Sequence, residues 1–317
     1  MRRHIISFLS VLALISVPNI SSSQVSSTYN FLKLDVGARA SALGGSFSTS
    51  VDDSYSMFYN PAAISTITKT QGRVGFHKYL LDINGGTAAY NQKLGNSGYV
   101  GAGIRYVNYG SFEGYDENSV SLGSFSANDL AFSVGYSNVY GDNFHYGANL
   151  KFIYSNIGEY SSSAFAADLG VQYIIPASMW NIGLSLLNVG GQIAKYGSVS
   201  EDLPIDLRAG ISKRLEHLPL RVYFEFDNLA SGEEDFFGRL KNISVGGEFE
   251  VSKNVDLRVG YNNGQRQDLK TGSSLGIAGF SAGIGLRLIE NYSLDYAFNS
   301  LGNVGSNHRI DIGFDLK

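Results

Sequence analysis

The sequence predicts an all-β fold, an antiparallel transmembrane β-barrel of about fourteen strands preceded by a short N-terminal hatch. Three observations support this fold class. Many strand-length segments alternate apolar and polar residues with a period of two. Their connections alternate between short and long. The composition is rich in glycine and aromatic residues and poor in charge. Together these features predict strands with one face toward lipid and the other toward the lumen of a barrel.

The composition excludes several other classes. The 317 residues include 38 Gly, 20 Tyr and 19 Phe but no Cys, so there is no disulfide framework and no thiolate metal site. The net charge of −4 leaves no electrostatic footprint for nucleic acid. A mean hydropathy of −0.04 is too polar for a bundle of membrane helices. It suits a barrel, in which every spanning strand is half polar.

Residues 1–23 are predicted to be a cleaved signal peptide. Arg2 and Arg3 form a basic start, and residues 5–17 form an apolar run that precedes the small residues Ser21 and Ser23. The alternative is an uncleaved anchor, but the run is shorter than the roughly 20 apolar residues that span a bilayer. We therefore expect export through the Sec pathway to the outer membrane of a Gram-negative bacterium.

The segment 144–154 shows the strand pattern most clearly. One face is apolar throughout, and the other contains His145, Asn149 and Lys151. Comparable segments occur at 71–80, 85–94, 98–108, 128–138, 144–154, 163–175, 179–188, 204–214, 219–228, 241–251, 254–263, 273–288, 290–298 and 307–316. The alternation changes frame across Gly279, which predicts a β-bulge there.

The connections follow the rule of outer-membrane barrels, with tight periplasmic turns and long external loops. The connections after even-numbered segments are two to four residues long. Most of the others are longer and polar, at 110–127, 155–162, 189–203, 229–240, 263–272 and 300–306. The apolar faces are therefore expected to meet lipid and the mixed faces to meet the lumen. Lys151 in lipid near the midplane would cost roughly 2–4 kcal/mol, so it is expected in the lumen.

Residues 24–70 lack the alternation and are predicted to be a hatch in the lumen of the barrel at 71–317. The stretches "FLKLDVGARASALGG" and "VDDSYSMFYNPAAIS" resemble the N-terminal signature of the PorV/PorQ family, which is related to the FadL-type outer-membrane barrels. Asn60, Pro61 and Ala62 match the Asn-Pro-Ala hatch motif of that family, whereas Ala63 stands where relatives often have Gly. The blocks at 101–137, 146–173 and 203–229 look most similar to the PorQ branch.

The resemblance implies a role in the type IX secretion system of a Bacteroidota outer membrane. Such proteins work in an attachment complex that processes cargo and links it to lipopolysaccharide. The implied partners are a PorZ-like surface protein, the sortase, a PorV-like shuttle and outer-membrane lipid. The long loops at about 110–127, 189–203 and 229–240 would form the docking surface.

Several side chains have two interpretations. The hatch motif is either a structural kink, which we favour, or part of a lateral opening for hydrophobic ligands. The candidate lumen charges form either a selective pore or a network that fixes the hatch, and the near balance of signs favours the network. These charges are Arg105, Lys151, Asp168, Asp206, Arg208, Arg221, Glu225, Asp256, Arg258, Arg309 and Asp311, with Glu248 and Arg287 beside them.

The loop "GEEDFFG" offers two further candidates. Phe236 and Phe237 are adjacent aromatics that mark either a protein interface or a lipid-dipping loop. Glu233, Glu234 and Asp235 are more consistent with a solvated loop than with a Ca²⁺ site.

Catalysis and cofactors find little support. The five histidines are dispersed, and neither a His-Glu-x-x-His nor a Gly-x-Ser-x-Gly motif is present. Together with the resemblance to the PorV/PorQ family, which implies type IX secretion, this favours a non-enzymatic scaffold with no cofactor. A FadL-like channel for hydrophobic small molecules is the alternative, and a general porin is a weaker third option.

Overall fold

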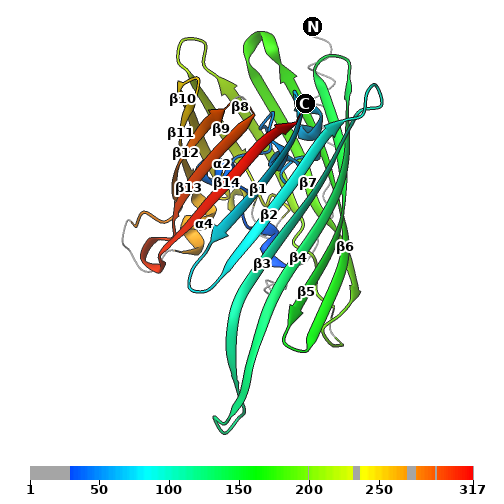
Figure 1. Ribbon diagram of the computed structural model, residues 1–317, viewed down its shortest axis with the longest axis vertical. Helices are drawn as coiled ribbons and strands as arrows, with labels where there is room; N and C mark the ends of the chain where they lie inside the picture. Colours follow the sequence, from blue (N-terminus) through cyan, green and yellow to red (C-terminus); the bar gives the residue numbers. More distant parts are fainter. Residues whose placement is uncertain (1–28, 199, 231–235, 270–275, 290, 317) are drawn as a thin grey trace.

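The chain forms a closed antiparallel barrel of fourteen strands in which β1 pairs with both β2 and β14 (Figure 1). The computed structural model describes residues 29–198, 200–230, 236–269, 276–289 and 291–316. The barrel confirms the fold class that the sequence predicts. The predicted signal peptide, residues 1–23, lies outside the described residues.

The strands and helices follow one another in a simple meander. No helix in the described part of the chain has the length and apolar character needed to cross a membrane. The strands are β1 (Thr70–Lys78), β2 (Asn84–Lys93), β3 (Tyr99–Tyr115), β4 (Ser121–Tyr140), β5 (Phe144–Ile157), β6 (Tyr160–Ile175), β7 (Trp180–Ala194), β8 (Asp206–Arg214), β9 (Leu220–Phe226), β10 (Ile243–Ser252), β11 (Val255–Asn262), β12 (Phe280–Ile289), β13 (Tyr292–Ser300) and β14 (Ser306–Leu316). The helices are η1 (Asn30–Lys33), α2 (Ala38–Ala42), η2 (Ser54–Phe58), η3 (Pro61–Thr66), η4 (Pro176–Ser178), α3 (Phe236–Arg239), α4 (Asn263–Asp268) and η5 (Gly302–Val304).

Each predicted segment overlaps one observed strand, but several boundaries are wrong. The expected loop 155–162 is mostly strand, because β5 runs to Ile157 and β6 begins at Tyr160. The expected loop 110–127 is mostly strand, because β3 and β4 continue as a hairpin in which Phe112 lies opposite Phe125. Segment 273–288 becomes strand only at Phe280. The expected bulge at Gly279 is also wrong: Gly279 precedes the strand with φ of 85°, and the register shift of β12 lies near its other end, between Arg287 and Ile289.

The two ends of the barrel differ. The short connections lie at the end where β1 begins and β14 ends, and the long ones lie at the opposite end (Figure 1). By the general rule for such barrels, the first end faces the periplasm and the second faces the exterior. The strands β3–β7 are the longest, and β3 and β4 extend farthest beyond the exterior rim (Figure 1).

The two faces of the wall carry the chemistry that their period of two predicts. On the outside, Leu150 is 66% exposed and Phe165 is 57% exposed, as expected for side chains that meet lipid. On the inside of β5, the strand that contains Leu150, the side chains of His145, Asn149 and Lys151 are buried.

The interior is filled by residues 29–69, which run within the barrel (Figure 1). We call this segment the hatch. One apolar cluster joins Tyr29, Phe31 and Leu32 to wall residues such as Val107 and Ile153. A second cluster is built mainly from the hatch itself, from Val36 to Ile64. The lumen of this barrel is therefore a protein core rather than an open pore.

The assignment of faces makes a direct prediction. Leu150→Lys places an ammonium group in lipid and is expected to cost roughly 2–4 kcal/mol, so that insertion falls sharply. Lys151→Leu combined with Asp168→Asn is the control on the lumen side: it removes both charges of a buried ion pair and is expected to insert. Insertion of each variant is measured by refolding into lipid vesicles. The folded barrel is then detected by its different gel mobility in heated and unheated samples. Equal insertion of the two variants would contradict the assignment.

Candidate functional site: the lumen and its periplasmic vestibule

Glycines on the inner wall let the hatch approach the strands closely. Four strand pairs place two glycines directly opposite each other, and each pair faces the hatch: Gly101 and Gly135, Gly147 and Gly170, Gly183 and Gly210, Gly246 and Gly260. The glycines thus follow the hatch around much of the barrel. This arrangement accounts for part of the high glycine content of the chain.

Gly147 shows why no larger residue fits. A Cβ atom at this position would lie 2.5 Å from the carbonyl oxygen of Pro61. On the neighbouring strand, a Cβ at Gly170 would overlap the side chain of Asn60. Hatch backbone therefore packs directly on wall backbone at these strands.

The predicted hatch motif lies at this contact. Asn60 is fully buried and caps η3, where its Oδ1 accepts a hydrogen bond from the backbone N–H of Ala62 at 3.1 Å. Its Nδ2 donates to the carbonyl oxygen of Ser48 at 2.9 Å and to that of Val171 in β6 at 3.0 Å. Pro61 occupies the first turn, where the missing N–H costs nothing. Asn60 thus joins two hatch segments to the wall.

Arg105 holds the first part of the hatch. From β3 it donates to the main-chain oxygens of Phe31 at 2.8 Å and Leu32 at 3.0 Å, and also to that of Leu34. These bonds satisfy carbonyl groups at the end of η1. A buried guanidinium with several carbonyl acceptors is well suited to fixing a chain that lacks a strand partner.

Lys151 and Asp168 form a buried ion pair on adjacent strands. Their Nζ and Oδ1 atoms are 2.8 Å apart, and Nζ also donates to Asn188 Oδ1 at 2.7 Å. Asp168 further accepts hydrogen bonds from Asn149 and from the backbone N–H of Asn188. The pair is compensated within the wall, which explains how a lysine is accommodated in the lumen.

Asp206, Arg208 and Glu225 form a second cluster. Arg208 lies 2.6 Å from Asp206 and 3.4 Å from Glu225, and its guanidinium carbon lies 5.2 Å from the ring centre of Tyr59 in the hatch. Glu225 also accepts a hydrogen bond from the backbone N–H of Ser48 at 2.8 Å. The cluster therefore joins wall strands to two parts of the hatch.

Arg309 and Asp311 on β14 hold helix α2. Arg309 donates to the hydroxyl of Ser41 at 2.7 Å, and Asp311 accepts a short hydrogen bond from the backbone N–H of Ala38. Because Ala38 is the first residue of α2, the carboxylate also lies where the helix leaves unsatisfied N–H groups.

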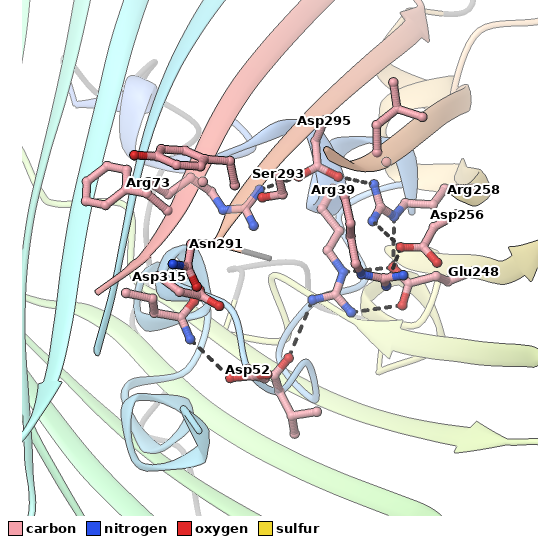
Figure 2. Close-up of a pocket in the computed structure, with 18 of the residues that line it drawn as sticks. Arg39, Asp52, Arg73, Glu248, Asp256, Arg258, Asn291, Ser293, Asp295 and Asp315 are labelled. Atoms are coloured by element: carbon pink, nitrogen blue, oxygen red, sulfur yellow. Dashed lines mark hydrogen bonds and ion pairs between the residues drawn. The ribbon is translucent and has the colours of Figure 1, made fainter. Parts of the chain in front are cut away.

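The largest network of charges crosses the periplasmic half of the lumen (Figure 2). Glu248 is held between Arg39 of the hatch and Arg258 of β11, each at 2.8 Å. Arg258 continues to Asp295 at 2.5 Å, and Asp295 makes a short ion pair with Arg73. The network thus alternates in sign from strand to strand.

The hatch closes this network. Asp53 lies 3.3 Å from Arg39 and 3.7 Å from Arg73. Asp256 extends it toward solvent through Arg287, at 2.6 Å. Buried charges are tolerated only when they are paired, so the network ties hatch and wall into one unit.

A polar vestibule of about 320 Å³ lies beside this network at the periplasmic end (Figure 2). Hatch residues Arg39, Val51 and Asp52 form part of its lining. Half of the wall residues that complete the lining are charged, and both signs are present. Such a lining suits water and polar groups rather than an apolar ligand.

Some predicted residues lie outside these clusters. Arg221 is half-buried and lines two cavities, and among the described residues it forms no ion pair. Phe236 and Phe237 begin α3, but their side chains are outside what the structure describes, as are Glu233, Glu234 and Asp235. Among the described residues, no three His, Asp or Glu side chains come together as a metal site.

Sequence reasoning did not single out four members of the network, namely Arg39, Asp53, Arg73 and Asp295. The alternation of polar and apolar residues could have identified two of them. Arg73 and Asp295 occupy polar positions of predicted strands next to apolar Val74 and Leu294. Arg39 and Asp53 lie in the hatch, where no period indicates which side chains face the wall.

Comparison with known families identifies the chain. Residues 18–213, more than half of the sequence, match the family described as type IX secretion system protein PorV. The chain belongs to the PorV family. The family description and the barrel fold together indicate an outer-membrane component of type IX secretion. No curated protein sequence matches it.

Solved structures share the fold of this PorV-family barrel. The toluene transporter TbuX of Ralstonia pickettii is 13% identical with a TM-score of 0.61, covering 89% of this chain and 98% of TbuX. The toluene transporter TodX of Pseudomonas putida is 13% identical with a TM-score of 0.60, covering 88% and 96%. A FadL homologue of Pseudomonas aeruginosa is 11% identical with a TM-score of 0.56, covering 89% and 98%.

The glycine contacts generate a second prediction. Gly170→Val is expected to displace Asn60 and loosen the hatch, giving ion conductance in planar bilayers and faster protease cleavage of the hatch. Gly247→Val is the matched control, since a Cβ there would meet only ordinary contacts at 3.7 Å. A Gly170→Val protein that conducts no ions and resists protease would contradict the close packing of hatch and wall.

A third prediction concerns Asp227, which follows β9. Burial, with Asp206 and Glu225 nearby, raises the pKa of its carboxyl from 3.8 to about 7, although Arg208 opposes this shift. A raised pKa in the folded state means that stability is lost as pH rises from about 4 through 7. Asp227→Asn is therefore expected to stabilise the barrel at pH 8 by at least about 1 kcal/mol, since one pKa unit corresponds to about 1.4 kcal/mol.

Urea unfolding of the Asp227→Asn and unsubstituted proteins at pH 4 and pH 8 measures the difference. The gain is expected to shrink toward pH 4. An equal gain at both pH values would show that ionisation of Asp227 is not its cause.

Proposed function

We propose that this chain is a non-enzymatic outer-membrane scaffold of the type IX secretion system. In this role it anchors the cell-surface attachment complex, which processes cargo and links it to lipopolysaccharide. Its membership of the PorV family supports a place in this system. The observation that carries the scaffold role is the filled lumen, in which the hatch is held by backbone packing and by buried ion pairs.

The finer assignment is to the PorQ branch, with residues 1–23 as the signal peptide, 24–70 as the hatch and 71–317 as the barrel. The partners in this proposal are a PorZ-like surface protein, the sortase, a PorV-like shuttle and outer-membrane lipid. A barrel without a passage acts through its surfaces. The exterior loops and strand ends therefore carry the function, and no cofactor is required.

The alternative is a channel for hydrophobic small molecules. It is favoured by the likeness of the fold to TbuX and TodX, which are described as toluene transporters. The charged lining of the vestibule weighs against it, because an apolar molecule leaving the hatch would meet arginine and carboxylate groups. We therefore prefer the scaffold.

Deletion of the gene tests the proposal. Cargo that carries type IX sorting signals is expected to lose its surface attachment, by at least tenfold in whole-cell immunoblots, and a plasmid copy is expected to restore it. Normal attachment after deletion would overturn the scaffold role. Uptake of radiolabelled toluene by the same strains decides the alternative, since only a channel predicts a loss there.

A further inference from the structure

The hairpin formed by the exterior ends of β3 and β4 stands apart from the rest of the wall (Figure 1). Pairing of β2 with β3 ends at Asn108, and pairing of β4 with β5 begins at Ala127. Residues 109–126, which we call the arm, therefore form a two-stranded ribbon beyond the barrel. Hydrogen bonds support the arm at its base. The N–H of Gly158 donates to the carbonyl oxygen of Ser126 at 2.9 Å, and the hydroxyl of Tyr109 donates to Asp129 Oδ2 at 2.5 Å.

Both edges of the arm are open. Among the described residues, the strand segments 111–115 and 121–125 pair only with each other. Proteins usually protect such edges with lysine, proline or a covering segment. The arm contains neither Lys nor Pro. Its outward N–H and C=O groups are thus available to an added strand.

The arm also presents apolar side chains to solvent. Leu122 is 71% exposed, and Tyr115 and Val120 are each 58% exposed. Phe112 and Phe125 stack across the two strands with ring centres 5.6 Å apart. Exposed apolar side chains on a projecting ribbon are typical of a protein interface.

The charge of the arm is entirely negative. Its ionisable carboxylates are Glu113, Asp116 and Glu117, and it contains no Lys, Arg or His. Asp116 is built into the tip, where its Oδ1 accepts hydrogen bonds from the N–H groups of Asn118 and Val120. An acidic apolar ribbon is repelled by anionic lipopolysaccharide and attracted by cationic side chains. Charge thus favours a basic protein over the membrane as the occupant.

We propose that the arm docks an extracellular β-sheet protein by adding its edge to a basic strand of that partner. Backbone hydrogen bonds supply the pairing, the aromatic stack supplies apolar contact, and the carboxylates select Lys or Arg on the partner. This inference rests on the proposed scaffold function and names the element that carries it.

Photo-crosslinking in intact cells tests the inference. A benzophenone amino acid replaces Leu122 in the full chain, and the same group at Tyr140, exposed at the periplasmic end, is the positional control. The Leu122 position is expected to give a protein adduct. Asp116→Lys with Glu117→Lys is expected to reduce that adduct at least tenfold. Asp142→Lys with Glu216→Lys, the matched change on periplasmic turns, is expected to leave it unchanged.

The outcomes separate the arm from the scaffold role. No adduct, an adduct with lipopolysaccharide alone, or an adduct indifferent to the arm charges would overturn docking by the arm. Complementation of the deletion strain with the charge-reversed variant then tests the scaffold function independently of the crosslink. If the deletion strain loses cargo attachment and the charge-reversed arm restores it fully, the scaffold role stands and the arm proposal fails.

Discussion

Backbone-to-backbone packing between the hatch and the wall is the contact on which this structure depends. It is possible only because glycines face the lumen at the height of the hatch, as Gly147 does against Pro61. Interiors packed at this density tolerate few added atoms. The hatch therefore behaves as the core of the barrel, although it is polar for much of its length.

The charged network follows from that packing. The hatch brings its polar groups into a space without bulk water, and each group needs a partner there. Arg39 and Asp53 meet wall charges, and carbonyl groups near Phe31 meet Arg105. Breaking one such contact leaves the partner uncompensated in a medium of low dielectric. The hatch therefore has one favoured position in the lumen, because any other position would leave buried charges without partners.

Much of the fold could be predicted from the sequence because a barrel wall between lipid and lumen imposes a strict period of two. That period placed Leu150 outside and Lys151 inside. It failed where neither face meets lipid, in the arm beyond the rim, where Ser and Gly made strands resemble a loop. It also carried no information within the hatch. The contacts of Asn60 with Ser48 and Val171 depend on three-dimensional folding that no local pattern encodes.

The hatch touches both sides of the seam at which the barrel closes. Asp53 reaches Arg73 on β1, and Ala38 and Ser41 reach Asp311 and Arg309 on β14. The segment that leads into the first strand therefore helps to hold the last. Closure of the barrel between β1 and β14 is therefore coupled to burial of the hatch, and the hatch acts as a template on which the wall closes.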